Sequence, residues 1–442
     1  MYVQALLKDC EKSCPTSLED YRAGGGYEAL SEAVLKLSPQ DLIGRLKDSG
    51  LLGRGGARFP TWRKWSFVHE HAPHPRYVVA NTDEMEPGTF KDRYLVNTNP
   101  HLVIEGLILA GYAIMAQKGF YFIRPTYEKD AQLMERELGV AREAGLLGKN
   151  ILGSDFSFDI IVHRSAGRYI CGEATAQVQA IMGKRAHPLK TVHMTDTGLW
   201  DKPTVVNNAE TLACVPLVIR NGGKWFKSLA RTESGDGTML FCISGKVKNP
   251  GCYELPMGIP FREILEEVAG GMLPGSEFKA FIPGGASTAF LPAKFLDVPM
   301  DTEGLKAIGH RLGTGAIMVF DQHSCLVGAT LNLMEYFSRE SCGFCTPCRE
   351  GIPYIRDLLW RIEMGEGKEE YITILREMAG HMSKAYCAFA PGAAESLLGL
   401  LNYFEDEVRE HIRQRQCPLK MIDGPARQLW YPPEPSRYPP GA

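Results

Sequence analysis

Four cysteines in the last third of the chain have the spacing of ligands for an iron–sulfur cluster. Cys342, Cys345 and Cys348 follow one another at C-x2-C-x2-C spacing, and Cys387 lies further along. Three neighbouring thiols and one remote thiol commonly hold a [4Fe–4S] cluster. Zinc is an alternative, because four thiolates also form a closed tetrahedral site, and buried cysteines without metal are a third interpretation. Since zinc sites usually consist of two C-x2-C pairs, the 3+1 spacing favours a cluster and therefore electron transfer.

A glycine-rich loop near the start of the chain has the composition of a phosphate-binding loop. Gly53, Gly55 and Gly56 expose backbone N–H groups that can surround a phosphate, and Lys64 can add a positive charge. The loop does not match G-x-G-x-x-G, because Arg58 stands where the last glycine would be. A plain tight turn is the alternative interpretation of the same glycines.

Polar side chains follow apolar runs at two further places. The run 77–80 ends in the polar and acidic segment 81–86, and the carboxyl ends of strands are where open α/β sheets usually bind ligands. Asn207 and Asn208 follow a second apolar stretch. Paired amides can donate to and accept from a flat heterocycle, although a turn capped by asparagine is the alternative.

Length and composition are those of a globular protein of about three domains. The chain has 442 residues, 44% of them hydrophobic, and a net charge of −3, which does not suggest a surface for binding polyanions. The 12 cysteines are scattered through apolar segments, unlike those of a small disulfide-rich secreted domain. No signal peptide is evident. The most apolar window, 101–116, is interrupted by Glu105 and is too short to span a bilayer.

The elements that must position these residues can be predicted from hydrophobic periodicity. Runs at 77–80, 119–123 and 158–163 are predicted strands, and 101–116 and 128–144 are predicted helices. Strands alternating with helices indicate an α/β layer. Before them, Ser38 and Pro39 have the pattern of a helix N-cap and first turn.

The remaining chain divides into two further regions. A hairpin over 240–255, a helix over 261–268 and a strand over 278–282 predict a small β-grasp-like module, which has no obvious chemistry of its own. Four helical segments then surround the cysteine loop, and a proline-rich tail follows Cys417. The predicted domains are 1–235, N-terminal helices with the α/β layer; 236–328, the β-grasp-like domain; and 329–442, the helical bundle with its tail.

Together these stretches resemble the NADH-oxidising flavoprotein subunit of respiratory complex I, NADH:quinone oxidoreductase (the F, or 51-kilodalton, subunit). The resemblance runs from about residue 20 to 415. Its most specific motif is ESCGFCTPCREG at 340–351, supported by DEMEPGTFKDR at 83–93 and YICGE at 169–173. The same module occurs in NAD-linked hydrogenases and formate dehydrogenases.

The resemblance implies an oxidoreductase that uses FMN and a [4Fe–4S] cluster as cofactors and NADH as substrate. A hydride would pass from NADH to FMN, and single electrons would continue to the cluster held by Cys342, Cys345, Cys348 and Cys387, so no side-chain general base is required. The implied architecture is α/β: a Rossmann-like domain for FMN and NADH, a β-grasp (ubiquitin-like) domain, and a helical bundle carrying the cluster.

The resemblance also implies which residues bind the nucleotides. The glycine loop and Lys64 would hold the FMN phosphate, Phe59 and Phe67 would flank the adenosine end of NADH, and Glu86 would lie near the nicotinamide. Residues expected near the flavin ring are Asn81, Asp83, Glu173, Asn207 and Asn208. The full set implied for cofactor binding is Gly53, Arg54, Gly55, Gly56, Phe59, Lys64, Phe67, Asn81, Asp83, Glu84, Glu86, Tyr169, Gly172, Glu173, Asn207 and Asn208.

The family's partners are a thioredoxin-like [2Fe–2S] subunit and a large iron–sulfur subunit of the same complex. The resemblance therefore implies a place in the peripheral arm on the cytoplasmic face of the inner membrane, with no nucleic-acid partner and no direct membrane insertion.

The chain departs from the family pattern around the predicted nucleotide site. Arg58 and Trp62 replace two glycines of the family loop, Ala174 replaces a glutamate, and 191–194 replaces a Pro-Pro-Phe-Pro run. Three hypotheses follow. The substitutions are tolerated in an ordinary NADH-oxidising member of the family; or the more positive site prefers NADPH; or Arg58 and Trp62 block the pocket, and the chain is a scaffold or relay for electrons from another donor.

Overall fold

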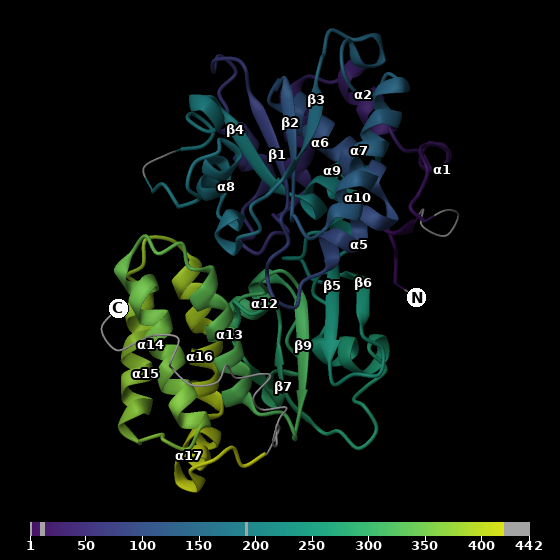
Figure 1. The fold of residues 1–442 in the computed structure, drawn as a ribbon. Helices are drawn as coiled ribbons and strands as arrows, with labels where there is room; N and C mark the ends of the chain where they lie inside the picture. The colour runs from purple at the N-terminus through teal and green to yellow at the C-terminus, as the bar shows by residue number, and fades with distance from the viewer. Residues whose placement is uncertain (1, 9–13, 191–192, 420–442) are drawn as a thin grey trace.

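The computed structural model describes residues 2–8, 14–190 and 193–419, and these form three packed parts (Figure 1). An α/β layer at the top of the view is followed by a mixed sheet, and a helical bundle lies beside that sheet. The proline-rich tail and part of the segment 191–194 lie outside the described residues.

The first part is built on a four-stranded parallel sheet. Its order is β3-β2-β1-β4, and β1 pairs in parallel with both β2 and β4. The strands are β1 (Tyr77–Thr82), β2 (Lys118–Ile123), β3 (Asp159–Arg164) and β4 (Thr204–Asn208). The three strands predicted from apolar runs are confirmed. Because β1 and β4 are parallel neighbours, the polar residues at their carboxyl ends meet at one edge of the sheet.

Helices cover this sheet, and the predicted ones are confirmed. The helices of the first part are α1 (Leu18–Ala23), α2 (Glu28–Lys36), α3 (Pro39–Ser49), α4 (Thr61–Ser66), α5 (Lys91–Thr98), α6 (Pro100–Ala113), α7 (Glu128–Glu143), α8 (Ala174–Ile181), α9 (Ala209–Asn221) and α10 (Gly223–Ser228). Ser38 and Asp41 form a capping box at the start of α3. Helix α3 ends at Gly50 in the left-handed region, where the glycine-rich loop begins.

Helix α6 is buried on nearly every side. The acidic residue within it, Glu105, is also buried, and its carboxylate is hydrogen-bonded. Glu105 is 1% exposed. It accepts hydrogen bonds from the Tyr21 hydroxyl and from the backbone N–H groups of Tyr27 and Leu30. A carboxylate with three donors is tolerated in a core. These hydrogen bonds of Glu105 therefore link the N-terminal helices α1 and α2 to α6.

The second part is a five-stranded mixed sheet of order β6-β5-β9-β7-β8. Its elements are β5 (Thr238–Gly245), β6 (Gly251–Pro256), α11 (Phe261–Glu263) with a π-helical turn over Ile264–Val268, β7 (Phe278–Ile282), β8 (Leu291–Pro292), α12 (Thr302–Ala307) and β9 (Ala316–Asp321). The predicted hairpin, helix and strand are confirmed. The central strand β9, which pairs with β5 and β7, was not predicted.

The third part is a bundle of five helices, one more than predicted. They are α13 (Leu326–Glu340), α14 (Thr346–Glu363), α15 (Glu370–Met382), α16 (Phe389–Tyr403) and α17 (Glu405–Gln414). The loop between α13 and α14 carries Cys342 and Cys345, the first turn of α14 carries Cys348, and the α15–α16 connection carries Cys387. The bundle thus brings all four predicted cluster ligands to the same end.

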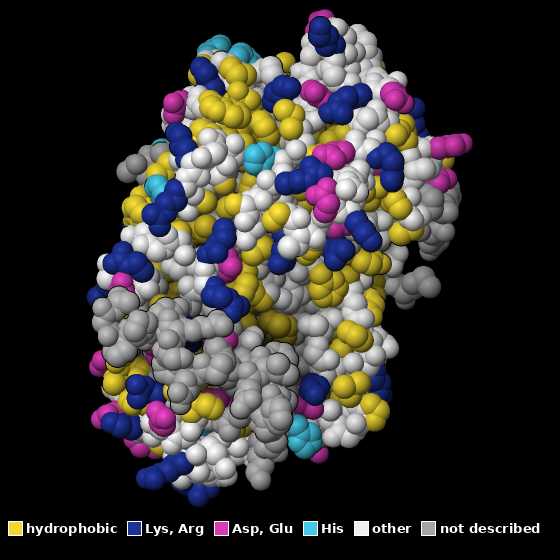
Figure 2. Space-filling view, in the orientation of Figure 1, with side chains coloured by type: hydrophobic (Ala, Val, Ile, Leu, Met, Phe, Trp, Pro, Cys, Tyr) yellow, Lys and Arg dark blue, Asp and Glu magenta, His cyan; other side chains and the backbone are white. Residues whose placement is uncertain are grey.

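Within the described ranges, no helix combines the length and apolar character needed to cross a bilayer. On the face shown in Figure 2, Lys and Arg side chains are interspersed with Asp and Glu, as expected for a net charge of −3.

Candidate functional site

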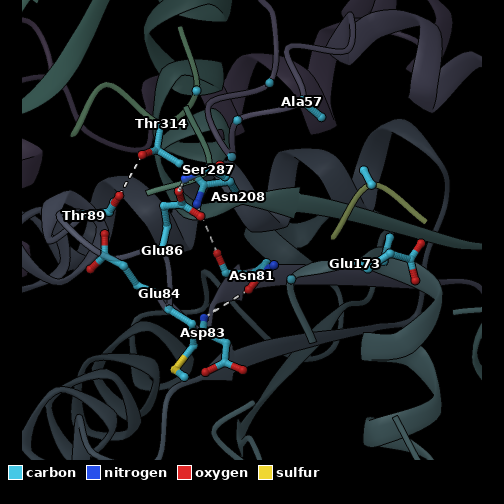
Figure 3. Close-up of a pocket in the computed structure, with 18 of the residues that line it drawn as sticks. Ala57, Asn81, Asp83, Glu84, Glu86, Thr89, Glu173, Asn208, Ser287 and Thr314 are labelled. Carbon is cyan, nitrogen blue, oxygen red and sulfur yellow. Dashed lines mark hydrogen bonds between the residues drawn. The ribbon is translucent and has the colours of Figure 1, made fainter. Parts of the chain in front are cut away.

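A cavity of about 450 Å³ lies where the three parts meet, within the size range of about 300–1,000 Å³ usual for small-molecule sites. Most of the predicted cofactor residues line it: Gly53, Gly55, Gly56, Phe59, Lys64, Asn81, Asp83, Glu84, Glu86, Tyr169, Gly172, Glu173, Asn207 and Asn208. Figure 3 shows several of these side chains coming from different elements around the space. Arg54 and Phe67, also predicted, are not among the lining residues.

The glycine-rich loop forms one wall and lies close to the end of β4. A Cβ built on Gly55 would come within 3.2 Å of the Asn208 Cβ, and Gly56 has φ +102°, so larger side chains fit poorly at both positions. The Lys64 ammonium donates to the Val206 carbonyl at 2.8 Å. Burial lowers the pKa of Lys64 to about 8. The loop thus presents backbone and one partly desolvated cation to the cavity.

Two arginines of this loop turn away from the cavity and share one carboxylate. The Asp236 carboxylate lies 3.0 Å from an Arg54 guanidinium nitrogen and accepts from Arg58 at 2.6 Å, and Arg58 also donates to the Thr302 hydroxyl. The Arg54 side chain is fully buried and that of Arg58 is 6% exposed. Arg58 borders the cavity, but its guanidinium is directed to Asp236, the carboxylate that it shares with Arg54.

Trp62 also leaves the cavity open. Its side chain packs against the core of the first part, and the Lys47 ammonium lies 5.2 Å from its ring centroid. Trp62 does not line the cavity. The hypothesis that Arg58 and Trp62 block the pocket is therefore wrong for this geometry. The sequence could not show that both side chains point outward.

The acidic residues after β1 have different partners. Glu84 accepts from the backbone N–H groups of Asp92 and Arg93 at the start of α5, and burial, followed by the Asp92 charge, raises the pKa of Glu84 to about 8. Burial raises the pKa of Asp83 to about 6. The Glu86 carboxylate accepts from the Tyr169 hydroxyl and the Ser287 backbone N–H. Burial raises the pKa of Glu86, although both donors oppose this.

The remaining predicted residues serve local structure as well as the cavity wall. Asn207 accepts from the Trp65 indole N–H at 2.9 Å. Asn208 caps α9 by accepting from the Glu210 N–H, as the alternative interpretation of an asparagine cap expected. Glu173 caps α8 by accepting from the Ala176 N–H. These side chains are fixed in place, which preorganises the cavity.

A buried charge network beneath the cavity was not among the predicted site residues. Lys91 is 1% exposed and donates to Asp92 at 2.7 Å, and its ammonium lies 2.8 Å from the Glu210 carboxylate and 3.1 Å from the Asn208 side-chain oxygen. The neighbouring carboxylates raise the pKa of Lys91 although burial opposes them. Both Lys91 and Asp92 line the cavity. Both residues belong to the motif at 83–93, and this motif was the sequence signal that could have identified them as site residues.

The mixed sheet contributes to the cavity, contrary to the prediction that this module has no chemistry of its own. Ser287, Arg311, Gly313 and Thr314 line the cavity, and a Cβ built on Gly56 of the glycine loop would lie 3.6 Å from the Thr314 side chain. The hydroxyls of Thr314 and Thr89 are hydrogen-bonded at 2.7 Å (Figure 3), and Arg311 donates to the Ser287 carbonyl. These residues lie in loops without a motif, so no sequence signal indicated them.

The four predicted cluster cysteines line one small cavity at the end of the bundle, together with Ile170, Pro188, Phe344, Ala385, Tyr386, Phe389 and Ala390. The Tyr386 N–H donates to Cys345 Sγ at 3.5 Å, and Ser341 Oγ lies 3.1 Å from Cys348 Sγ. Four sulfurs from two segments, with polar donors to two of them, fit an iron–sulfur cubane.

The two cavities share a wall. Cys387, Ile170 and Phe389 border both the large cavity and the small one. A molecule in the large cavity and a metal cluster held by the cysteines would thus be separated by only these side chains. This arrangement suits electron transfer between them.

Comparison with known proteins agrees with this geometry. Residues 46–217 match the model of the Nuo51 FMN-binding domain, 240–291 the SLBB domain, and 328–411 the NADH-ubiquinone oxidoreductase-F iron-sulfur binding region. The match to the SLBB domain lies within the mixed sheet.

Whole-chain relatives were also found. The F subunit of the NADH-quinone oxidoreductase of Salmonella typhimurium is 44% identical over 414 residues, which are 93% of each chain. An F subunit of Rhizobium meliloti NADH-quinone oxidoreductase, the one numbered 2, is 45% identical over 421 residues, covering 95% of this chain and all of that one. A chain of the NAD+-reducing [NiFe]-hydrogenase in the H2-reduced state superposes with a TM-score of 0.79 and 30% identity, covering 94% of this chain and 68% of that one.

Proposed function

Because the chain belongs to the family of NADH-quinone oxidoreductase F subunits, we propose that the cavity between its three parts is where electrons from NADH enter a multisubunit oxidoreductase. The chain is an NADH-binding FMN subunit that transfers electrons to an iron–sulfur cluster. The main support for placing electron entry in the large cavity is the wall that this cavity shares with the cysteine-lined cavity.

The residues of the large cavity fit FMN and NADH. Gly53, Gly55, Gly56 and Lys64 all line the cavity, so backbone N–H groups of the loop and the Lys64 ammonium are available to a phosphate there. Residues proposed around the flavin ring are Asn81, Asp83, Glu173, Asn207 and Asn208. When bound, FMN accepts a hydride and releases electrons singly. The protein's own contribution is to bind, orient and exclude water.

Three further predicted residues, Glu86, Phe59 and Phe67, fit the second nucleotide. Glu86, held by Tyr169 and Ser287, is proposed to lie near the nicotinamide. Phe59 and Phe67 are 38% and 48% exposed, with ring centroids 6.3 Å apart. Phe59 lines the cavity, and two neighbouring exposed aromatic rings offer a stacking surface for an adenine. The Arg54 side chain is not proposed to contact either nucleotide, because its guanidinium is buried against Asp236.

The substitutions around the site favour NADH over NADPH as the substrate. Arg58 would be the new cation for an extra phosphate, but its guanidinium already donates to Asp236 and to the Thr302 hydroxyl rather than facing the cavity. Ala174, in the first turn of α8, lines the cavity without adding charge. We expect purified protein to carry FMN and its flavin absorbance to bleach at least about tenfold faster with NADH than with NADPH, a difference of about 1.4 kcal/mol.

Anaerobic stopped-flow absorbance checks this preference. Equal bleaching by the two nucleotides would contradict the assignment to NADH, and protein isolated without flavin would contradict the proposed site. Arg58→Gly with Trp62→Gly is a useful control, because the Arg58 guanidinium is bound to Asp236 and Trp62 does not line the cavity, so the double substitution should not raise the flavin content.

Lys64 should make FMN binding depend on pH. Its ammonium has a pKa of about 8 in the free protein, lowered by burial. The charged form, present below pH 8, attracts the phosphate, so flavin binding above that pH must take up a proton. We expect the dissociation constant of FMN for flavin-stripped protein to rise above pH 8 by up to about tenfold per pH unit.

Fluorescence titration of FMN at several pH values measures this effect. Lys64→Met should bind more weakly and lose the rise. Arg63→Met is the matched control on the same helix, since Arg63 is exposed and stacks on Phe67 rather than facing the cavity. The same pH profile in Lys64→Met and wild type would remove Lys64 from the phosphate site.

The finer architecture and the partners are also proposals. The parallel order β3-β2-β1-β4 supports a Rossmann-like domain, and the mixed sheet with its helical turn supports a β-grasp domain. Phe344 and Tyr354 near the cysteine loop are 49% and 45% exposed, which supports docking of a further iron–sulfur subunit there. The proposed partners are a thioredoxin-like [2Fe–2S] subunit and a large iron–sulfur subunit, in the peripheral arm on the cytoplasmic face of the inner membrane.

A further inference from the structure

A second group of metal-binding side chains is buried at the other end of the helical bundle. Cys325, Glu363, His411 and Cys417 each present one ligand atom, and the four atoms lie within 4.8 Å of one another. We call this group the distal cluster. All four residues are between 0% and 8% exposed. None of them lines the cofactor cavity or the cysteine-lined cavity.

The distal cluster is far from the proposed iron–sulfur site. Cys325 caps the start of α13, whereas Cys342 follows its end. Glu363 is the last residue of α14, and Cys348 is in its first turn. Helices of 15 and 18 residues are about 22 and 27 Å long. In Figure 1, α17, which carries His411, lies at the end of the bundle away from the α/β layer.

The distances within the distal cluster are those of ligands around one small ion. Cys325 Sγ lies 3.2 Å from His411 Nε2 and 3.8 Å from a Glu363 carboxylate oxygen. His411 Nε2 and that Glu363 oxygen are 3.3 Å apart. Ligands bound tetrahedrally to zinc at its usual bond lengths are separated by roughly 3.4–3.8 Å. Only small adjustments would bring the side chains into coordination.

The imidazole of His411 is already oriented as a metal ligand. Its Nδ1 lies 2.7 Å from the Glu407 carbonyl oxygen, so Nδ1–H donates there and Nε2 turns its lone pair to the distal cluster. Glu407 is itself fixed, because its carboxylate accepts from the Leu326 N–H at 2.7 Å and the Lys279 ammonium at 2.8 Å. This outer layer of hydrogen bonds resembles the support found around ligating histidines.

The cysteines also have the character of ligands. The sulfurs of Cys325 and Cys417 lie within 4.8 Å of each other and of the His411 and Glu363 ligand atoms. Thiolate is the form that binds metal. The surroundings are apolar, since the four residues sit at the edge of the bundle's hydrophobic core with Leu326, Ile362 and Val408. Buried ionisable groups in such a place are normally paired with one another or coordinate a metal ion.

We propose that the distal cluster binds one Zn²⁺ as a closed structural site with two sulfurs, one imidazole nitrogen and one carboxylate oxygen. Four protein ligands leave no open position for catalysis, which is typical of structural zinc. The ligands come from four segments: the start of α13, the end of α14, α17, and the chain just after α17. The ion would therefore clamp α17 and the following chain onto the bundle.

Metal analysis of the full-length wild-type protein tests this proposal first. Protein isolated anaerobically with reductant should contain about one zinc per chain in addition to the cluster iron. X-ray absorption at the zinc edge should show two sulfur and two nitrogen or oxygen neighbours. Zinc well below one equivalent, or a Cys325–Cys417 disulfide found by mass spectrometry in this protein, would overturn the proposal.

Variants then locate the ion. Cys325→Ser and Cys417→Ser should each lower the zinc content at least tenfold and leave the iron content unchanged. Cys387→Ser is the reciprocal control, which should lose iron and keep zinc, and Cys14→Ser, at an exposed cysteine, should keep both metals. Zinc that persists in Cys325→Ser but disappears in Cys387→Ser would place the ion in the iron–sulfur site and reject the proposal.

If the serine variants do not fold, Co²⁺ gives a readout on the wild-type chain. Protein grown with Co²⁺ in place of zinc should show the visible absorption bands of tetrahedral Co²⁺ with thiolate ligands. Those bands should disappear when Zn²⁺ is added. Absence of such bands in folded protein that has taken up its cluster iron would contradict a four-coordinate site.

Discussion

Cys387→Ala is expected to abolish electron transfer out of the protein while NADH can still bleach its flavin. In the proposed ligand set, Cys387 would supply the one cluster sulfur that does not come from the α13–α14 loop or the first turn of α14, and it lies in the wall shared by both cavities. A [4Fe–4S] cluster is normally held by four thiolates, so a cluster with only three protein ligands should dissociate from the protein more easily. The iron content should fall toward zero, and the rate of turnover with a one-electron acceptor should drop by about 100-fold or more. This exceeds the loss of activity that usually follows when a residue hydrogen-bonded to a metal ligand is removed.

Three measurements on the same preparation distinguish the outcomes: iron content, the low-temperature electron paramagnetic resonance signal of the reduced cluster, and bleaching of flavin absorbance by NADH. Cys171→Ala is the matched control, because Cys171 belongs to the hydrophobic core against which the partly buried Cys387 packs but lies outside the cysteine-lined cavity. Full iron content in Cys387→Ala would remove Cys387 from the ligand set.

Asp236→Ala is expected to cause the largest loss of stability among single substitutions near the loop. Asp236 is 2% exposed and is the shared partner of the Arg54 and Arg58 guanidiniums. Its removal leaves two buried positive charges side by side, and breaking a buried pair in this way costs about 3–5 kcal/mol. The free energy of unfolding should fall by that amount, and the denaturant midpoint with it.

Two reference substitutions make this test specific. Asp297→Ala removes the carboxylate from an exposed ion pair with Arg262 and should not shift the midpoint measurably. Arg58→Gly removes only one guanidinium, leaves Asp236 paired with Arg54, and relieves the φ of +53° at Arg58. It should therefore destabilise far less than Asp236→Ala. Equal effects of Asp236→Ala and Asp297→Ala would show that the buried pair is not coupled to folding.

Regular elements were predictable where the pattern was local. The strands β1, β2 and β3, the capping box at Ser38 and the cysteine spacing all depend on residues close together in the sequence. The strand β9 was missed although its residues are apolar, because its place between β5 and β7 is set by long-range pairing. Local propensity does not carry that information.

In the candidate site, too, residues in local sequence patterns could be predicted and residues placed by long-range contacts could not. The glycine loop and the segment after β1 were found because glycine and acidic clusters are visible in sequence. Ser287 and Thr314 were not, because isolated polar residues in loops have no recognisable pattern. The direction of the Arg58 side chain depends on Asp236, 178 positions away. For that reason the Arg58 guanidinium is directed to Asp236 rather than into the cavity, which the substitution of a glycine by arginine did not reveal in the sequence.

The walls of the cofactor cavity belong to all three parts of the fold, and this limits how such a unit can be exchanged between enzymes during evolution. The glycine loop, Ser287 and Cys387 come from different parts, so a cut at either boundary between the parts would leave an incomplete binding site. Recombination that preserves activity must transfer the three parts as one cassette. A bound nucleotide that touches each of them also acts as a cross-link, so its loading should make the whole chain melt as one cooperative unit.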